Sequence, residues 1–317
     1  MVTTGPGTGA GRRAWAQTAA APSPLRVVAS ILTLWLVGGV VYPLLTMASD
    51  HLAAVQVTAV RTTGAVLMTT PVLLSRMHGR LHALRSFHAI WPNVVAAVAF
   101  YPVGNGLLTY ASGHLPSSLS ALSFSMLPVL AAVVSALRGS ALGRWVWLGI
   151  GGSIVSLVLV VGAPGSGVPG PALAAALASV VCWFAGTEFW AARSRDLDLI
   201  ASVWIQLTVG SIACWVSVAL SGSGMPSAAS VLQPAVVLLA FSQFIQHVAY
   251  LGVAGRVSPL VLTSFAFVNP VVAGLAGYLL LQQRLSVLQA AGSATLLLSV
   301  LLVVRGAQRS SARIPGD

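Results

Sequence analysis

Long apolar runs separated by short polar segments follow one another along the chain from residue 26 to residue 304. A helix of about 20 apolar residues, rising 1.5 Å per residue, crosses the roughly 30 Å hydrocarbon core of a bilayer. The runs therefore predict ten transmembrane helices. In the first half they lie at 26–48, 55–75, 90–110, 117–137 and 145–163, and in the second at 171–192, 199–220, 234–254, 259–281 and 286–304.

The composition supports an all-α membrane protein. Of the 317 residues, 57% are hydrophobic and only 7% are charged, whereas a soluble domain has about a quarter charged residues. Ten helices and short loops leave no room for a large soluble domain. Residues 1–25, rich in Gly, Thr, Ala and Pro, predict a disordered cytoplasmic tail, and residues 305–317 predict a second cytoplasmic tail.

The arginines indicate how the helices are oriented. The net charge is +11 and all sixteen basic residues are Arg, but they lie between the apolar runs rather than on one surface. This distribution argues against nucleic acid as a partner and is typical of a topology signal. With the N-terminus inside, all but Arg61 and Arg284 fall on the cytoplasmic side. We predict a multi-pass protein of the cytoplasmic (inner) membrane with both termini in the cytoplasm.

The chain contains a weak internal repeat. The stretch 250–286 has a fainter copy at 107–142, in which Pro270 matches Pro128 at an offset of 142 residues. Each half has five predicted helices, an odd number, so the two halves must enter the membrane from opposite sides. The sequence thus predicts two inverted five-helix repeats, at 26–163 and 171–304, which is an architecture of many secondary transporters.

Several short motifs resemble the drug/metabolite transporter superfamily, specifically its EamA-type ten-helix branch, over about residues 26–304. The motifs are Leu34-Trp35, the position of Arg61, Met126-Leu127-Pro128, Trp183, Arg256-Val257-Ser258-Pro259 and Asn269-Pro270. The chain departs from the family pattern at two turns, where Gly139-Ser140-Ala141 and Gln282-Gln283-Arg284 replace a Gly-Glu-Arg sequence. The resemblance implies a transporter of small solutes, more often an exporter, and leaves the substrate class open.

Polar and aromatic side chains within the apolar runs are the candidate substrate site, because a polar group in hydrocarbon is costly unless it faces the bundle interior or water. Gln243 and His247 lie four residues apart and share a helix face. The alternatives are interhelical hydrogen bonds for the polar residues and core packing for the aromatic ones. The full set of candidate cavity residues is Trp35, Tyr42, Tyr101, Asn105, Trp183, Gln243, His247 and Asn269.

Two residues are candidates for coupling transport to protons or cations. Glu188 is the only Glu in the chain and falls in the sixth apolar run. His247 has a side chain whose ordinary pKa lies near neutral pH. The alternative for Glu188 is a structural one, since it lies near the cytoplasmic end of its helix and can balance Arg193 or Arg195. Arg61 is expected near the outer end of the second helix, in an ion pair with Asp50.

Two prolines are candidate hinges. Pro128 and Pro270 lie inside apolar runs, and each lacks the N–H that would bond to a carbonyl one turn earlier. Membrane helices tolerate such breaks where a neighbour or a cavity satisfies the freed carbonyl. The alternative is a static kink.

These features predict a secondary transporter that exports a small organic metabolite or drug-like solute by alternating access. An integral membrane enzyme acting on lipid-linked molecules would need clustered acids or a nucleophile at one interface, and a facilitator channel would need rings of charge; both remain alternatives. Cys182 and Cys214 lie in apolar runs, and no metal or cofactor is predicted. The expected partners are the solute and the lipid bilayer, and a homodimer is left open.

Overall fold

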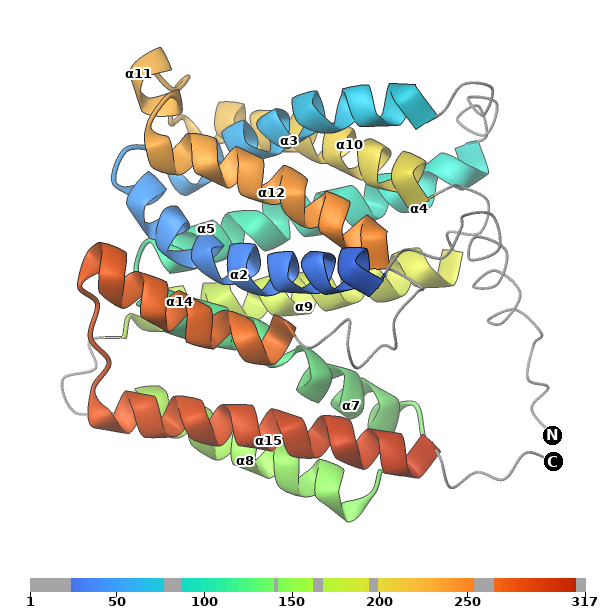
Figure 1. The fold of residues 1–317 in the computed structure, drawn as a ribbon, viewed down its shortest axis with the longest axis vertical. Helices are drawn as coiled ribbons and strands as arrows, with labels where there is room; N and C mark the ends of the chain where they lie inside the picture. Colours follow the sequence, from blue (N-terminus) through green and yellow to red (C-terminus); the bar gives the residue numbers. More distant parts are fainter. Residues whose placement is uncertain are drawn as a thin grey trace.

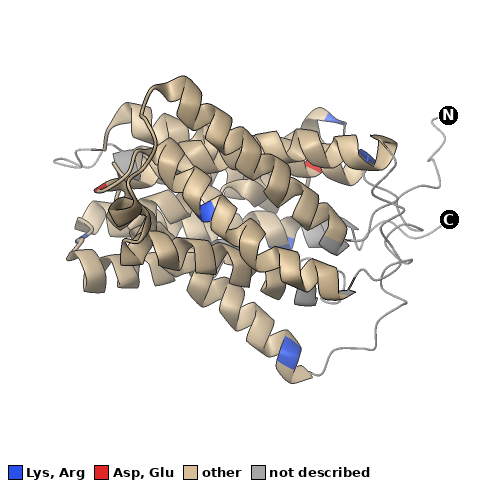
Figure 2. Cartoon of the chain, turned by 90° about the horizontal axis from the view of Figure 1, so that it is seen from above, with Lys and Arg blue, Asp and Glu red and all other residues tan. Residues whose placement is uncertain are grey.

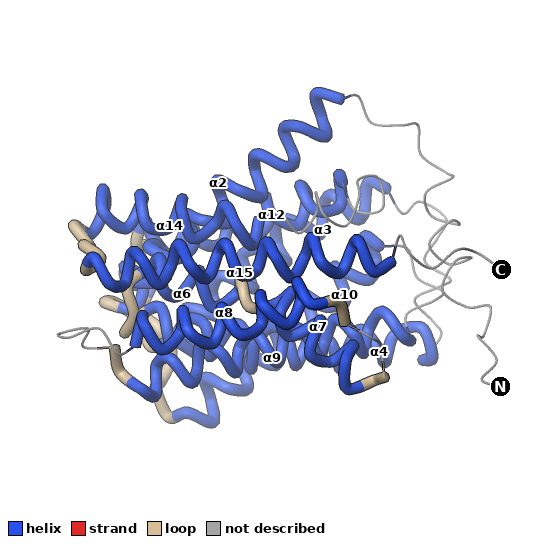
Figure 3. Tube along the Cα trace, turned by 90° about the horizontal axis from the view of Figure 1, so that it is seen from below, coloured by secondary structure: helices blue, strands red, loops and turns tan. Residues whose placement is uncertain are grey.

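The computed structural model describes residues 24–76, 87–139, 142–161, 168–193, 199–253 and 265–311, and within these ranges it contains helices and no strands (Figure 3). Most of the predicted N-terminal tail, residues 1–23, lies outside the described residues. The helices lie side by side in one elongated bundle (Figure 1).

The helices of the first half follow the predicted apolar runs. They are α2 (Pro24–Ser49), α3 (Ala54–Arg76), α4 (Phe87–Val98), η2 (Ala99–Asn105), α5 (Gly106–Ser112), α6 (Ser117–Phe124), α7 (Leu127–Leu137) and α8 (Arg144–Val161). The helices of the second half are α9 (Gly170–Arg193), α10 (Leu199–Ser221), the short α11 (Ala228–Val231), α12 (Pro234–Val253), α14 (Phe265–Leu281) and α15 (Val287–Ser311). The beginning of the predicted run 259–281, up to residue 264, lies outside the described residues.

Seven helical stretches in the described ranges are long and apolar enough to cross a membrane: Pro24–Ser49, Ala54–Ser75, Phe87–Ser112, Ser117–Leu137, Gly170–Arg193, Ala201–Ser221 and Val287–Gly306. Two shorter apolar helices, Pro234–Tyr250 and Val268–Leu281, lie in the same bundle. The expectation of an all-helical protein with several apolar helices of spanning length is met. The count of ten spans stays a prediction.

The predicted helix at 117–137 is interrupted. Between α6 and α7 the N–H groups of Ser125 and Met126 bond to oxygens only three residues earlier. Pro128 falls in the first turn of α7, where its missing N–H is no loss because the first helical N–H groups have no intrahelical partner. The break therefore lies just before Pro128. In contrast, α14 runs without interruption through Pro270.

The predicted helix at 90–110 contains a π-helical segment, η2. The N–H of Gly106 reaches the oxygen of Tyr101, five residues earlier, instead of the usual four. Pro102 lies inside this segment and cannot donate a backbone hydrogen bond, which favours a local widening of the helix. Single π turns inside α-helices are frequent at functional sites.

The last helix extends beyond the apolar run 286–304. α15 continues to Ser311 and so includes Arg305 and Arg309, which belong to the predicted cytoplasmic tail. Arginine is a good helix former, so the helix can extend beyond the apolar run.

Small residues set the spacing of the helices. α2 packs against α12 and α14, α3 against α10 and α12, and α8 pairs with α15 at one side of the bundle (Figure 1). At Gly39 of α2, an added Cβ would lie 2.6 Å from Cγ1 of Val272 on α14. At Gly149 of α8, it would lie 2.5 Å from the backbone oxygen of Ser299 on α15. Such glycines let helix backbones approach closely in a membrane.

We predict opposite effects of Gly→Ala substitutions at two neighbouring positions on α8. Gly149→Ala should lower the melting temperature of the full chain in detergent, because overpacking against α15 costs about 1–3 kcal/mol. Gly151→Ala should keep or raise it, since nothing lies within 4 Å of the new methyl group and Ala is about 1 kcal/mol better than Gly in a helix. Equal melting temperatures for the two variants would contradict the α8–α15 contact.

Candidate functional site

Charged residues are rare in the bundle (Figure 2), and one of them lies in its interior. Arg61 is on α3, seven residues or about 10 Å along the helix from its first residue. Its side chain is only 7% exposed, and its Nε donates to Oε1 of Gln243 on α12 at 2.8 Å. The expected ion pair with Asp50 is wrong, because Asp50 is exposed near the end of α2 and the guanidinium points to α12 instead.

A hydrogen-bond chain continues from Gln243 to η2. Nδ1 of His247 lies 2.6 Å from the backbone oxygen of Gln243, and its Nε2 lies 3.2 Å from the hydroxyl of Tyr101. A backbone oxygen can only accept, so in the neutral imidazole Nδ1 carries the proton and Nε2 accepts from the Tyr101 hydroxyl. Arg61, Gln243, His247 and Tyr101 thus connect α3, α12 and η2. We call these four residues the Arg61 cluster.

The π-helical segment places Tyr101 and Asn105 on the buried side of η2. The Tyr101 ring lies against Gly210 of α10, where an added Cβ would lie 2.7 Å from its Cγ. Oδ1 of Asn105 accepts a hydrogen bond from Nε1 of Trp183 on α9 at 3.3 Å. The Trp183 ring stacks on that of Phe100, with centroids 4.5 Å apart. Asn105 and Trp183 therefore form a second polar and aromatic contact beside the Arg61 cluster.

The remaining predicted cavity residues lie on α2 and α14. Tyr42 is buried on α2, in a core cluster that includes Val57 of α3 and Leu239 of α12. Asn269 and Trp35 instead belong to the α2–α14 contact. In the amide orientation that satisfies its neighbours, Asn269 donates to the backbone oxygens of Trp35 at 3.1 Å and of Phe265 at 3.3 Å. The structure thus connects Tyr101, Gln243 and His247 by hydrogen bonds, pairs Asn105 with Trp183, and places Asn269 between two helices.

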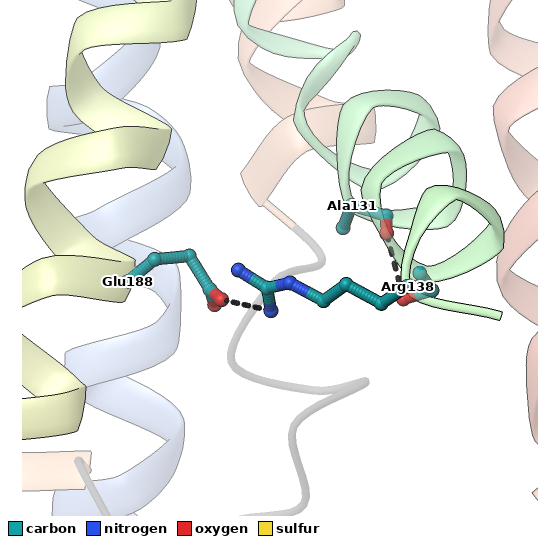
Figure 4. Close-up of polar contacts among 4 residues, drawn as sticks. Ala131, Arg138 and Glu188 are labelled. Atoms are coloured by element: carbon teal, nitrogen blue, oxygen red, sulfur yellow. Dashed lines mark hydrogen bonds and ion pairs between the residues drawn. The ribbon is translucent and has the colours of Figure 1, made fainter. Parts of the chain in front are cut away.

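Glu188 lies apart from the interior cluster. Its Oε2 forms an ion pair with Nη1 of Arg138 at 2.9 Å, joining α9 to the end of α7 (Figure 4). The two side chains are 43% and 65% exposed, so the pair contributes at most about 1 kcal/mol. Of the two partners considered from sequence, Arg193 lies over the Phe189 ring at 4.5 Å, and Arg195 lies outside the described residues.

Two donors of the Arg61 cluster are unpaired. Nη1 of Arg61 and Nε2 of Gln243 are both buried and have no hydrogen-bond partner. Sequence reasoning did not assign Arg61 to the candidate site. The sequence did contain one signal for Arg61: it is one of the two arginines that do not fall on the predicted cytoplasmic side of the membrane. In the part of the chain that the structure describes, no three His, Cys, Asp or Glu residues group as metal ligands.

The chain is similar to proteins named as membrane transporters over most of its length. It is 24% identical over 287 residues to the uncharacterized inner membrane transporter YedA of Escherichia coli strain K12, covering 89% of this chain and 92% of that protein. It is 25% identical over 291 residues to the uncharacterized transporter YvbV of Bacillus subtilis strain 168, covering 87% and 90%. No protein-family model matches the chain.

A solved crystal structure has a similar fold. It matches with a TM-score of 0.58 over 90% of this chain and 98% of its own length, at 19% sequence identity. At this identity the likeness concerns the arrangement of helices alone.

The hydrogen bond between Tyr101 and His247 can be tested by removing one hydroxyl group. We expect Tyr101→Phe to lower the free energy of unfolding by about 1 kcal/mol, because it leaves a buried imidazole nitrogen without a donor. Tyr110→Phe on α5 is the matched control, since that side chain is 40% exposed. Melting of both variants in detergent measures the difference, and a Tyr101→Phe protein as stable as the control would exclude the bond.

Proposed function

We propose that the chain is a secondary transporter that moves a small organic metabolite or drug-like solute across the cytoplasmic membrane by alternating access. The observation that carries the proposal is the Arg61 cluster, a connected polar network inside an otherwise apolar helical bundle. Polar and ionised groups at such positions in membrane helices mark solute or ion pathways by default. The similarity to proteins named as transporters, along about nine-tenths of the chain, supports the same conclusion.

We further propose that the chain is an EamA-type member of the drug/metabolite transporter superfamily, with ten spans in two inverted repeats. If the halves are equivalent, α3 corresponds to α10, α8 to α15, and α6 with α7 to α14. Each of these equivalent pairs is in contact, at α3–α10, α8–α15 and α6–α14. The contact of α2 with α12 likewise has a counterpart, that of α9 with α4, η2 and α5. A two-fold axis through the bundle accounts for this pattern.

The ends of α7 and α14 support the same equivalence. Gly139 follows α7 with a φ of 86°, and Gln282 follows α14 with a φ of 54°. Both residues thus adopt the left-handed conformation that commonly ends a helix. Gln282 is not a glycine and adopts it at a steric cost, which is consistent with a backbone conformation retained from a duplicated turn.

Alternating access requires two arrangements of the halves, and the helix contacts suggest where they differ. α2 and α14 approach closely through Gly38 and Gly39. The equivalent approach of α9 to α7 includes the exposed ion pair between Glu188 and Arg138. We infer that this pair forms and breaks during transport, and that protonation of Glu188 would weaken it by removing its charge. Pro128, at the break before α7, is placed to serve as the hinge, with Pro270 as its counterpart on α14.

The transport proposal is tested by solute flux in proteoliposomes. The full chain should transport at least one labelled solute from a panel of small organic metabolites. The solute flux should be faster with a pH gradient across the liposome membrane than without one. Glu188→Gln or His247→Ala should reduce the effect of the gradient at least tenfold if that residue carries the coupled proton. Arg144→Met, which alters an exposed arginine at the start of α8, is the control and should behave as wild type.

Two results would contradict the proposal in different ways. An absence of flux above that of empty liposomes for every solute in the panel would reject the transporter function. Gradient-dependent flux that is unchanged in both Glu188→Gln and His247→Ala would retain the transporter and reject both residues as proton carriers.

The predicted orientation is tested with reporter fusions. Reporters placed after Arg138 and after Gly165 should read as cytoplasmic and external respectively, because one helix separates the two positions and the arginines favour a cytoplasmic N-terminus. The reverse result would overturn the orientation, and identical readings at both positions would overturn the fifth span.

A further inference from the structure

We propose that Arg61 and Gln243 bind the carboxylate of the transported solute, and that the solute is a small monocarboxylate with an uncharged remainder. This assignment rests on the proposed transport function and names the class of substrate. It follows from three properties of the Arg61 cluster: an uncompensated charge, unpaired donors and uncharged surroundings.

The charge of Arg61 has no counter-charge in the described protein. The guanidinium is always protonated under physiological conditions and its side chain is 93% buried, as the 7% exposure implies. Two acids lie in the described ranges. Asp50 is exposed, and Glu188 is paired with Arg138. An isolated charge inside a protein is strongly unfavourable unless a charged partner accompanies it. A bound anion supplies that partner.

The unpaired atoms of the cluster are all donors. Nε of Arg61 is bonded to Oε1 of Gln243, which places the Gln243 amide next to the guanidinium and leaves its Nε2 free. Nη1 of Arg61 and Nε2 of Gln243 are then two buried N–H groups without acceptors, on side chains that a hydrogen bond joins. A carboxylate accepts hydrogen bonds on both oxygens and donates none, so it fits two such donors. A neutral amide or alcohol would leave the positive charge uncompensated.

The other members of the cluster hold this arrangement and do not supply the missing acceptor. The Tyr101 hydroxyl and Nε2 of His247 are bonded to one another, and Nδ1 of His247 is bonded to the backbone of Gln243. Tyr101 and His247 are therefore positioning residues, which connect the α12 backbone at Gln243 to η2.

The surroundings favour an uncharged remainder of the solute. The residues that contact Tyr101 and extend from it are aromatic or neutral: Phe100, Trp183 and Asn105. Among the described interior residues no acid is present to pair with an ammonium group, so the site suits a simple carboxylate better than a zwitterionic amino acid.

Binding can be measured without transport, on the purified full chain in detergent. The probes are four acids and their primary amides: butyrate, benzoate, phenylacetate and indole acetate. We expect at least one acid to raise the melting temperature while its amide does not. At a concentration ten times its dissociation constant, a ligand of the folded state raises the folded-to-unfolded ratio about elevenfold. The proposal is overturned if no acid stabilises the wild type, or if the amides stabilise it equally.

Three variants assign the effect to Arg61 and Gln243. Arg61→Met should abolish the acid-dependent shift and Arg61→Lys should retain part of it, because Lys keeps the charge but not the planar donor pair. Gln243→Glu places a carboxylate where Arg61 is already bonded, so it should raise the melting temperature of the free protein and abolish the shift. Arg144→Met should keep the full shift. A shift that persists in Arg61→Met would overturn the assignment.

The same measurements separate this proposal from the transport proposal and from binding of an inorganic anion. An acid-specific, Arg61-dependent shift without flux would support the site and reject the transporter. Flux of uncharged solutes that is equal in wild type and Arg61→Met would support the transporter and overturn the carboxylate site. A shift produced equally by sodium chloride would mean an adventitious ion only, and would also overturn it.

Discussion

An ionised side chain inside an apolar helical bundle has to find its partners within the protein or in a bound molecule, because hydrocarbon offers none. Arg61 is subject to this constraint more than any other described residue. It satisfies one N–H through Gln243 and leaves another unpaired. The helices that meet at this point, α3, α12 and η2, are connected by a few buried polar bonds.

The backbone of η2 explains how a helix can contribute two polar side chains to this region. A π-helical turn, in a segment that contains Pro102, brings Tyr101 and Asn105 to the buried side. The close approach of Gly210 on α10 leaves space for the Tyr101 ring. Substitutions at Pro102 or Gly210 would therefore alter the Arg61 cluster indirectly, through the position of Tyr101 and hence of His247.

The helix contacts of the two halves are similar in pattern and different in detail. α2 and α14 are in close contact through glycines and the Asn269 amide, whereas α7 and α9 are linked by an exposed ion pair. A contact of glycines against a helix backbone resists separation, while an exposed ion pair exchanges readily with water.

The sequence by itself determined where the helices lie, because the length and apolarity of a membrane-spanning run are local properties. The runs at 26–48 and 199–220 correspond to α2 and α10 within two residues at each end. Proline positions also indicated the break before α7, though not that α14 would continue through Pro270.

Only the tertiary structure decided which polar residues meet. Asp50 was the nearest acid to Arg61 along the chain, yet Gln243, 182 residues away, is its partner. Glu188 likewise contacts Arg138, from another helix, instead of the nearby Arg193. Partner choice depends on which helices pack together and at what depth, and neither quantity is contained in the composition or periodicity of a single segment. The physical reason is that a side chain within the bundle reaches only a few ångströms, and helix packing alone decides what lies within that reach.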